Sequence, residues 1–433
     1  MKARFIKLTA IFIFSIMVYA CSEDEINYTD NWVADNSTEA WEEQITEGRA
    51  ELWHTGLPVI VINTPNKKPV NSKYTWVDEA SFECFNADST INSTATTRIR
   101  LHGNSSRGCP KVSYNLDFTD KTSVLSMPPH RRWILIANHF DKTMLRNSLG
   151  QWLGRKFGSF AYSPRNQFVE VILNGEHLGT YMLIEHIRQS NNRVENGYVI
   201  EFDDKFAKDD IVFQSVIRGG SDTINVNIKD PDIEMDGEEF NHIKNLINSL
   251  SSTLYGNDPF NKDNGYFHVA DRETFADFYI VNEISKNVDA RFYSSCFANL
   301  TTYDRLYMGP LWDFDVGFGN YVFENPYTIN EPTGLYMHKC PWIEIMLKEN
   351  EFNRIVSRNL KRYFKNEQMI MDQIDKFCND IINSVVLNER KWGVLSAESK
   401  DMSDEQIKEL YMEQVNWLKN WIHERFIYLD TKY

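Results

Sequence analysis

The sequence lacks several features that define common protein classes. Its 433 residues hold 46 Lys and Arg against 61 Asp and Glu, so the formal net charge is −15. This shortage of positive charge argues against a nucleic-acid partner, because neutralising phosphates requires a basic face. The six cysteines contain no CxxC pair, so neither a structural zinc site nor a disulfide framework is expected. Their wide spacing leaves the pairing of any single bridge open.

The chain begins with an apolar run that is too short to cross a membrane. The run covers residues 8–20 and follows Lys2, Arg4 and Lys7. A spanning helix needs roughly 20 apolar residues, whereas a secretory signal has a basic start and a shorter apolar centre. We therefore predict a signal peptide over residues 1–20.

The residues around Cys21 indicate a lipid anchor. Val18-Tyr19-Ala20 before this cysteine resembles a bacterial lipobox, and the acidic Ser22–Glu25 stretch resembles the surface-export tag of Bacteroidetes lipoproteins. We expect lipidation of Cys21, a polar tether over residues 21–50, and a surface-exposed outer membrane lipoprotein held to the membrane by its lipid. The alternative is an ordinary secreted protein with a chance cysteine.

The rest of the composition describes a folded chain. Apolar residues make up 42% and aromatic residues 13% of the sequence. Strand patterns dominate the first part: an apolar stretch at 57–64, alternation over 98–118, and a hairpin signal at Asn174-Gly175. Residues 141–158 interrupt them with apolar residues at helical spacing.

The second part of the sequence is more helical. Asp271 is expected to cap a helix, a hairpin is expected over 290–315, and three amphipathic patterns follow Trp342. The predicted fold class is α+β, with a β-rich region over 51–190 and a mainly helical region over 191–433.

Two carboxylates in the segment GPLWDFDVGFGN, residues 309–320, raise the question of a metal site. Side chains two apart in a strand share a face, so Asp313 and Asp315 are expected to reach one cation. Hard cations such as Mg²⁺ take one or two carboxylates and share phosphate oxygens. The alternative is a turn whose aspartates face water.

Asp289 lies where a carboxylate needs another explanation than helix capping. It follows a helix predicted to end near Lys286, and a carboxylate near a helix C-terminus is disfavoured by roughly 0.3–1 kcal/mol. A functional role for Asp289 is therefore expected.

Five sequence blocks, in their order along the chain, resemble the spore-coat protein H (CotH) kinase family. They are RLHGNSSRGCPKVSYNLDF, DKTMLRNSLG, NGEHLGTYMLIEHI, NVDARFYSS and GPLWDFDVGFGN. The resemblance implies an atypical, two-lobed protein-kinase-like fold with a β-rich N-lobe and a mainly helical C-lobe. It also implies an extracytoplasmic kinase that uses ATP with Mg²⁺ or Mn²⁺ and phosphorylates serine or threonine of an unidentified surface or secreted protein. Two alternatives stay open: a catalytically weak CotH-like adhesin or interaction lipoprotein, and a polysaccharide-handling lipoprotein.

The resemblance also assigns roles to individual residues. The nucleotide is expected at Lys111 and Arg100 through its phosphates, at Glu185 beside the base, and at the polar loop that contains Gly103, Ser105 and Ser106. Lys111 is expected on the solvated face of its strand, and Arg146 of the LRN block is expected to pair with a carboxylate. Asp289 is expected to orient or deprotonate the acceptor hydroxyl. The metal is expected at Asp313, Asp315 and Ser294, where the family often has asparagine at the last position.

Overall fold

The computed structural model describes residues 54–433 apart from 105–107, 207–209 and 324–328. The predicted signal peptide and tether, Cys21, Ser105 and Ser106 lie outside the described residues. Among the helices of the described part, none combines the length and the apolar character that a membrane span requires.

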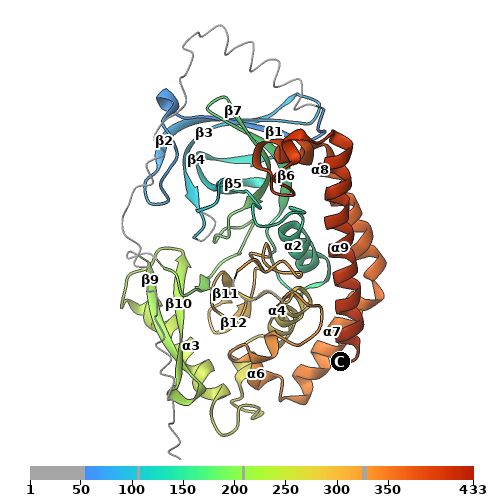
Figure 1. The fold of residues 1–433 in the computed structure, drawn as a ribbon. Helices are drawn as coiled ribbons and strands as arrows, with labels where there is room; N and C mark the ends of the chain where they lie inside the picture. Colours follow the sequence, from blue (N-terminus) through green and yellow to red (C-terminus); the bar gives the residue numbers. More distant parts are fainter. Residues whose placement is uncertain (1–53, 105–107, 207–209, 324–328) are drawn as a thin grey trace, which may run out of the picture.

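Seven strands of the N-terminal region form a closed barrel (Figure 1). Their order around it is β1-β2-β3-β4-β5-β7-β6, and every neighbouring pair is antiparallel except β1 with β6. Alternate side chains such as Ile99, Leu116 and Trp133 fill the interior. The strands are β1 (Val59–Asn63), β2 (Val77–Phe85), β3 (Ile91–His102), β4 (Ser113–Val124), β5 (Met127–Ile136), β6 (Asn166–Leu173) and β7 (Glu176–Glu185).

A second sheet of five strands follows the barrel. Its order is β12-β11-β8-β10-β9, and α3 (Glu238–Leu254) packs against β9 through contacts such as Phe213 with Phe240. Its strands are β8 (Val199–Phe202), β9 (Ile211–Ile217), β10 (Asp222–Asp230), β11 (Cys296–Thr302) and β12 (Arg305–Met308).

Helices connect the barrel with the second sheet. Helices α8 and α9 lie side by side along one flank of the molecule, and α8 also contacts β7 of the barrel (Figure 1). One hydrophobic core joins α2, α4 and the C-terminal helices to the second sheet. The α-helices are α2 (Arg146–Phe157), α3, α4 (Arg272–Ser285), α6 (Ile343–Met346), α7 (Asn350–Lys365), α8 (Glu367–Trp392) and α9 (Asp404–Asp430). Short 3₁₀ turns are η1 (Pro65–Lys67), η3 (Arg218–Gly220), η4 (Tyr266–His268), η5 (Met337–Lys339) and η6 (Ser399–Asp401).

The α+β prediction is confirmed, with a β-rich first region and a more helical second one. The sequence did not indicate that the first sheet closes. Closure comes from the parallel pairing of β1 with β6, two strands far apart in the chain. The kinase-like, two-lobed description stays a prediction.

Local signals were reliable at capped ends and tight turns. Asp271 caps α4 by accepting a hydrogen bond from Thr274 N at 2.9 Å, and the hairpin at Asn174-Gly175 is present. The helix expected from residue 141 begins only at Arg146. The Asp141 carboxylate accepts hydrogen bonds from the backbone N–H groups of Thr143 and Arg146, which holds residues 141–145 in a turn before the helix.

Candidate active site

A polar cavity of about 270 Å³ opens between the barrel and the elements that follow it. The barrel contributes the ends of β3 and β5 and the start of β4, including His102, Gly103 and Ser113. The other wall comes from the residues after β8, α4 and β12. These are Asp204, Lys205, Asp289, Tyr293, Ser294, Ser295, Asp313, Asp315 and Val316.

Asp313 and Asp315 meet in this cavity, but not as strand neighbours. Strand β12 ends at Met308, and Asp313 has a φ of +62° in an irregular segment, so the predicted strand geometry is wrong. Aspartate tolerates this left-handed conformation better than most residues. The turn brings the two carboxyl groups within hydrogen-bonding reach of each other. The two carboxyl groups therefore meet through a turn, and their joint binding of a cation stays a prediction.

Side chains of helix α2 hold the backbone of the segment that contains Asp313 and Asp315. Asn147 Oδ1 accepts a hydrogen bond from Phe314 N at 2.7 Å, and Gln151 Nε2 donates to Leu311 O at 2.7 Å. On the other side of the pair, Asn320 Nδ2 donates to the backbone oxygens of Asp315 and Phe140 at 2.6 and 3.0 Å. The backbone that carries both aspartates is thus held by two side chains of α2 and by Asn320.

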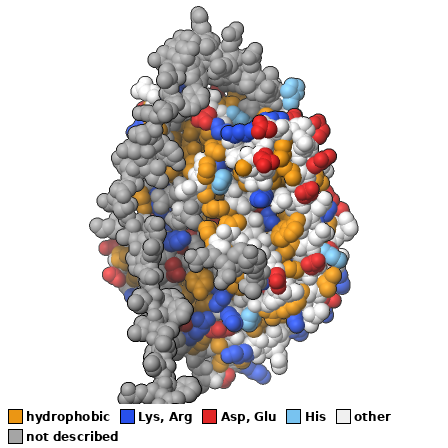
Figure 2. Space-filling model, in the orientation of Figure 1, with side chains coloured by type: hydrophobic (Ala, Val, Ile, Leu, Met, Phe, Trp, Pro, Cys, Tyr) orange, Lys and Arg blue, Asp and Glu red, His pale blue; other side chains and the backbone are white. Residues whose placement is uncertain are grey.

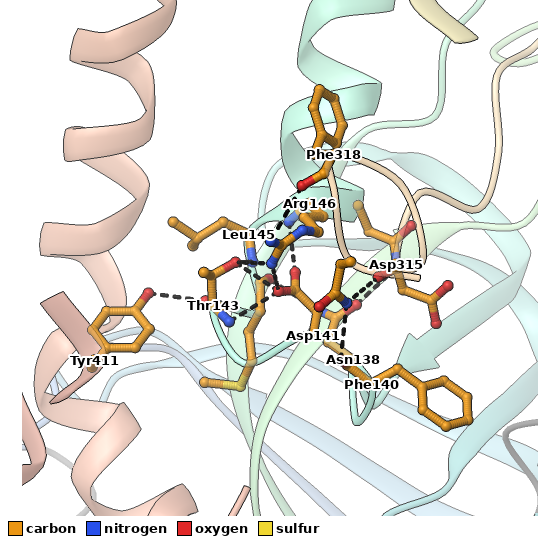
Figure 3. A network of polar contacts seen from close by, with 12 residues as sticks. Asn138, Phe140, Asp141, Thr143, Leu145, Arg146, Asp315, Phe318 and Tyr411 are labelled. Carbon is orange, nitrogen blue, oxygen red and sulfur yellow. Dashed lines mark hydrogen bonds and ion pairs between the residues drawn. The ribbon is translucent and has the colours of Figure 1, made fainter. Parts of the chain in front are cut away.

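A buried ion pair lies beside Asp315 (Figure 3). Arg146 pairs with Asp141, as the LRN block predicted for a carboxylate, and its Nη2 reaches Phe318 O at 3.4 Å. Asp141 also accepts hydrogen bonds from the Thr143 N–H and hydroxyl at 2.9 and 2.7 Å, and Tyr411 of α9 donates to Thr143 O at 2.9 Å. This network connects α9, through Thr143, to the ion pair beside Asp315.

The aspartate pair carries an electrostatic penalty in the absence of a cation. Burial raises the pKa of Asp313 and, more strongly, that of Asp315, which also experiences the negative charges of Asp313 and Asp141. A divalent cation between the two carboxylates would offset this repulsion.

Asp289 faces the same cavity from the loop after α4. The helix ends with Lys286 in a left-handed conformation, and Asn287 Nδ2 donates to Asp313 O at 2.9 Å, which couples the two acidic segments. Burial and the negative charge of Asp313 raise the pKa of Asp289 to about 6. The carboxylate is therefore ionised at neutral pH but basic enough to accept a proton.

Asp203 is a further member of the site that the sequence analysis missed. It follows β8, and its Oδ2 accepts hydrogen bonds from Ser294 Oγ at 3.0 Å and from Ser295 N at 3.3 Å. Ser295 Oγ in turn donates to Asp313 Oδ2 at 3.3 Å. Asp203 thereby links the end of β8 to Ser294 and Ser295, and through Ser295 to Asp313. A signal was available, since the YVIEFDD sequence places acidic residues directly after an apolar strand.

Lys111 does not line the acidic cavity. Its side chain is 1% exposed, so the expectation of a solvated strand face is wrong. The Nζ donates to Asn388 Oδ1 of α8 at 2.8 Å and to Thr180 O, and it lies 4.5 Å from the centre of the Tyr181 ring. Burial lowers the pKa of Lys111 to about 7. Residues 137–139 line the acidic cavity, and they also line a small pocket to which Lys111 contributes.

The other residues expected at the nucleotide divide into two groups. Gly103 lines the cavity, whereas Arg100 stacks on Trp76 with its guanidinium carbon 4.4 Å from the ring centre. Glu185 is buried and accepts hydrogen bonds from Tyr162 Oη at 3.1 Å and from Arg165 Nε at 3.0 Å, away from the cavity. Ser294 lines the cavity, with its hydroxyl donating to Asp203.

The donor set fits a cation that shares its coordination sphere with a ligand. Within the described ranges, no three His, Cys, Asp or Glu side chains form a group arranged to hold a metal ion. Mg²⁺ commonly takes only one or two carboxylates and completes its sphere with water and phosphate oxygens. Asp313 and Asp315 supply that number.

The sequence also matches a known family. The sequence model of the family described as CotH kinase protein matches residues 99–429, well over half of the chain. The chain belongs to the CotH kinase family. The matched range includes the barrel from the end of β3, the aspartate cavity and all C-terminal helices. No curated protein matches the chain.

Proposed function

We propose that this CotH family protein is an atypical protein kinase that transfers the γ-phosphate of ATP to serine or threonine of a surface or secreted protein. The observation that carries the proposal is the convergence of Asp289, Asp313 and Asp315 from two separate segments in one cavity. Phosphoryl transfer depends on positioned charges more than on covalent catalysis by the protein. Two carboxylates that hold a metal ion and a nearby base are therefore sufficient for the reaction.

Each carboxylate has a role in this proposal. Asp313 and Asp315 would hold Mg²⁺ or Mn²⁺, which neutralises phosphate charge when it is bound. Asp289 orients the acceptor hydroxyl and takes its proton while the hydroxyl oxygen bonds to the γ-phosphorus. The bond from that phosphorus to the bridging oxygen of ADP breaks in the same displacement. A pKa of about 6 suits Asp289 to this exchange near neutral pH.

The basic contact to the phosphates has two candidates. Lys205 lines the cavity, and its charge opposes the raised pKa of Asp289 and Asp313. Lys111, the family-based candidate, would first have to leave Asn388 and Thr180. We therefore assign the phosphate contact in this arrangement to Lys205.

A binding module without catalysis is the second candidate. The Ser294 hydroxyl is already engaged by Asp203, and serine is a poorer metal ligand than the asparagine common at this position in the family. A protein that kept the cavity and lost turnover would serve as a surface interaction lipoprotein. For either candidate, attachment to the outer membrane through Cys21 rests on the N-terminal sequence.

Metal-dependent nucleotide binding separates the two candidates. We expect ATP with Mg²⁺ to raise the melting temperature of the protein, as mass action requires, and ATP with EDTA to raise it much less. Lys205→Ala should reduce the shift, whereas Lys361→Ala, an exposed lysine on α7, should leave it unchanged. A shift that ignores the metal, or no shift at all, would favour the interaction module.

A further inference from the structure

The outer face of the barrel next to the cavity forms a ladder of three cross-strand rows. Strands β3 and β4 pair His102 with Ser113, Arg100 with Asn115, and Arg98 with Asp117. The first of these rows lines the acidic cavity. Because residues two apart in a strand rise by about 7 Å, the row of Arg98 lies about 13 Å from the cavity edge. The ladder is thus a direct extension of the candidate active site.

Arginines crowd the far rows of this ladder. Trp76 stacks against Arg98, Arg100 and Arg132, whose guanidinium carbons lie 4.7, 4.4 and 5.5 Å from the ring. Arg131 joins them, and the side chains of Arg98 and Arg131 are 40% and 50% exposed. We call Trp76 with Arg98, Arg100, Arg131 and Arg132 the arginine ladder.

The arginine ladder holds more positive than negative charge. Asp117 receives the ion pairs of Arg98 at 2.7 Å, Arg132 at 3.3 Å and Arg131 at 3.5 Å. One carboxylate therefore serves three guanidinium groups. In the described part of the chain, the shielded Nε of Arg100 has no hydrogen-bond acceptor.

The neighbouring charges do not remove this excess. Burial, together with the positive charges of Arg98 and Arg188, lowers the pKa of Arg100, and Asp117 and Asp210 only partly oppose the shift. Where side chains are visible in Figure 2, acidic and basic ones are interspersed. A basic cluster whose positive charge is only partly compensated, in a chain of net charge −15, marks a place for an anionic partner.

We infer that the arginine ladder binds an extended acidic segment of the acceptor protein and so selects serines flanked by glutamate or aspartate. That this partner accepts phosphate rests on the proposed kinase function, whereas its binding to the arginine ladder does not. An extended chain advances about 3.3 Å per residue. If one residue of the bound segment lies beside His102, an acidic residue two positions farther along that segment reaches Arg100. One four positions farther along reaches Arg98.

Peptide binding to the intact protein tests this inference without requiring catalysis. Three fluorescent peptides share a central serine and carry glutamate, glutamine or lysine at the positions two to four residues away on both sides. Fluorescence anisotropy is expected to show the tightest binding for the glutamate peptide, with affinity that falls as NaCl is raised. Equal affinity for the three peptides would overturn the inference.

Single substitutions assign the binding to the arginine ladder. Arg98→Gln and Arg132→Gln should each weaken binding of the glutamate peptide about two- to fivefold. Asp117→Asn should strengthen it, because the opposing carboxylate charge is removed. Arg354→Gln, an exposed arginine of α7, is the matched control and should change nothing. Unchanged affinity in a folded Arg98→Gln protein would contradict the assignment.

Two further outcomes separate this inference from the proposed function. If Arg98→Gln fails to fold, the sign of the Asp117→Asn effect still decides, and weaker binding there would overturn the inference. If a single-stranded oligonucleotide displaces the glutamate peptide and binds more tightly, the inference of an acidic protein segment is overturned in favour of a nucleic-acid partner. Selective binding of the glutamate peptide by a protein that shows no metal-dependent ATP binding would support the arginine ladder and overturn the kinase proposal.

Discussion

Substitution of Gly150 tests whether helix α2 positions the aspartate pair. A Cβ at Gly150 would lie 2.2, 2.4 and 2.6 Å from three atoms of the Phe314 ring, which sits between Asp313 and Asp315 in the sequence. Ordinary carbon contacts are about 3.5–4.0 Å, so in Gly150→Ala the ring must move by about 1.3–1.8 Å. Phe314 N is held by Asn147, so the shift is passed on to the neighbouring carboxylates.

The stability cost of this substitution should be small and the functional cost large. Overpacking costs about 1–3 kcal/mol, and replacing a helical glycine by alanine returns about 1 kcal/mol. The net destabilisation is therefore about 0–2 kcal/mol. A misplacement of about 1 Å in positioned groups can reduce a rate roughly 100-fold.

The assay pairs thermal melting with ATP binding in Mg²⁺ and with phosphate transfer. Gly154→Ala on the same helix is the control, because its Cβ would meet the end of a flexible Leu311 side chain at 2.8 Å. We expect Gly150→Ala to remain folded and to lose metal-dependent binding and transfer, and Gly154→Ala to retain most of both. Full activity in Gly150→Ala would refute the view that Phe314 fixes the pair.

Three further predictions concern other parts of the chain. Asp203→Asn should lower kcat/KM about tenfold or more, because a weaker acceptor then holds Ser294 near the aspartate pair; unchanged kinetics would leave this residue without a role. Lys111→Met should remove a pH dependence of stability: burial lowers the pKa of Lys111 from 10.5 to about 7, so wild-type stability falls as pH drops from about 10.5 to 7, and below 7 the loss is complete. The unfolding free energies of the wild type and of Lys111→Met, measured across that range, should converge toward high pH. Parallel curves would contradict a lowered pKa of Lys111. Cys21→Ala should release the protein from the membrane fraction, and equal recovery of the two proteins would exclude a lipid anchor there.

The sequence predicted elements where a short pattern fixes the backbone locally. Asp271 could be identified as a cap and Asn174-Gly175 as a turn because each acts on residues within a few positions. The closure of the barrel could not, since it depends on the pairing of β1 with β6, about a hundred residues later. Register between distant strands is decided by packing, which no local pattern reports.

The candidate site was predicted better in its residues than in its geometry. Asp289 was found because helix capping does not explain it, and Asp313 because it lies two residues from Asp315 in an apolar segment. Asp203 was missed because its hydrogen-bond partners, Ser294 and Ser295, are far from it in the sequence. Lys111 was misplaced because its strand pattern alternates as if solvated, while α8, almost 280 positions later, covers it.

The central claim is that the carboxylate cavity transfers phosphate, with Asp289 acting on the acceptor and Asp315 on the metal. The most direct measurement follows phosphate from ATP into serine of the protein itself or of the glutamate peptide, by mass spectrometry, with Mg²⁺ or with EDTA. We predict transfer only with Mg²⁺, a loss of about 10²–10⁴-fold in Asp289→Asn with ATP binding retained, and a loss of both transfer and ATP binding in Asp315→Asn. Asp304→Asn, an exposed loop aspartate, should behave as wild type. Undiminished transfer by Asp289→Asn, or transfer that persists in EDTA, would contradict the account.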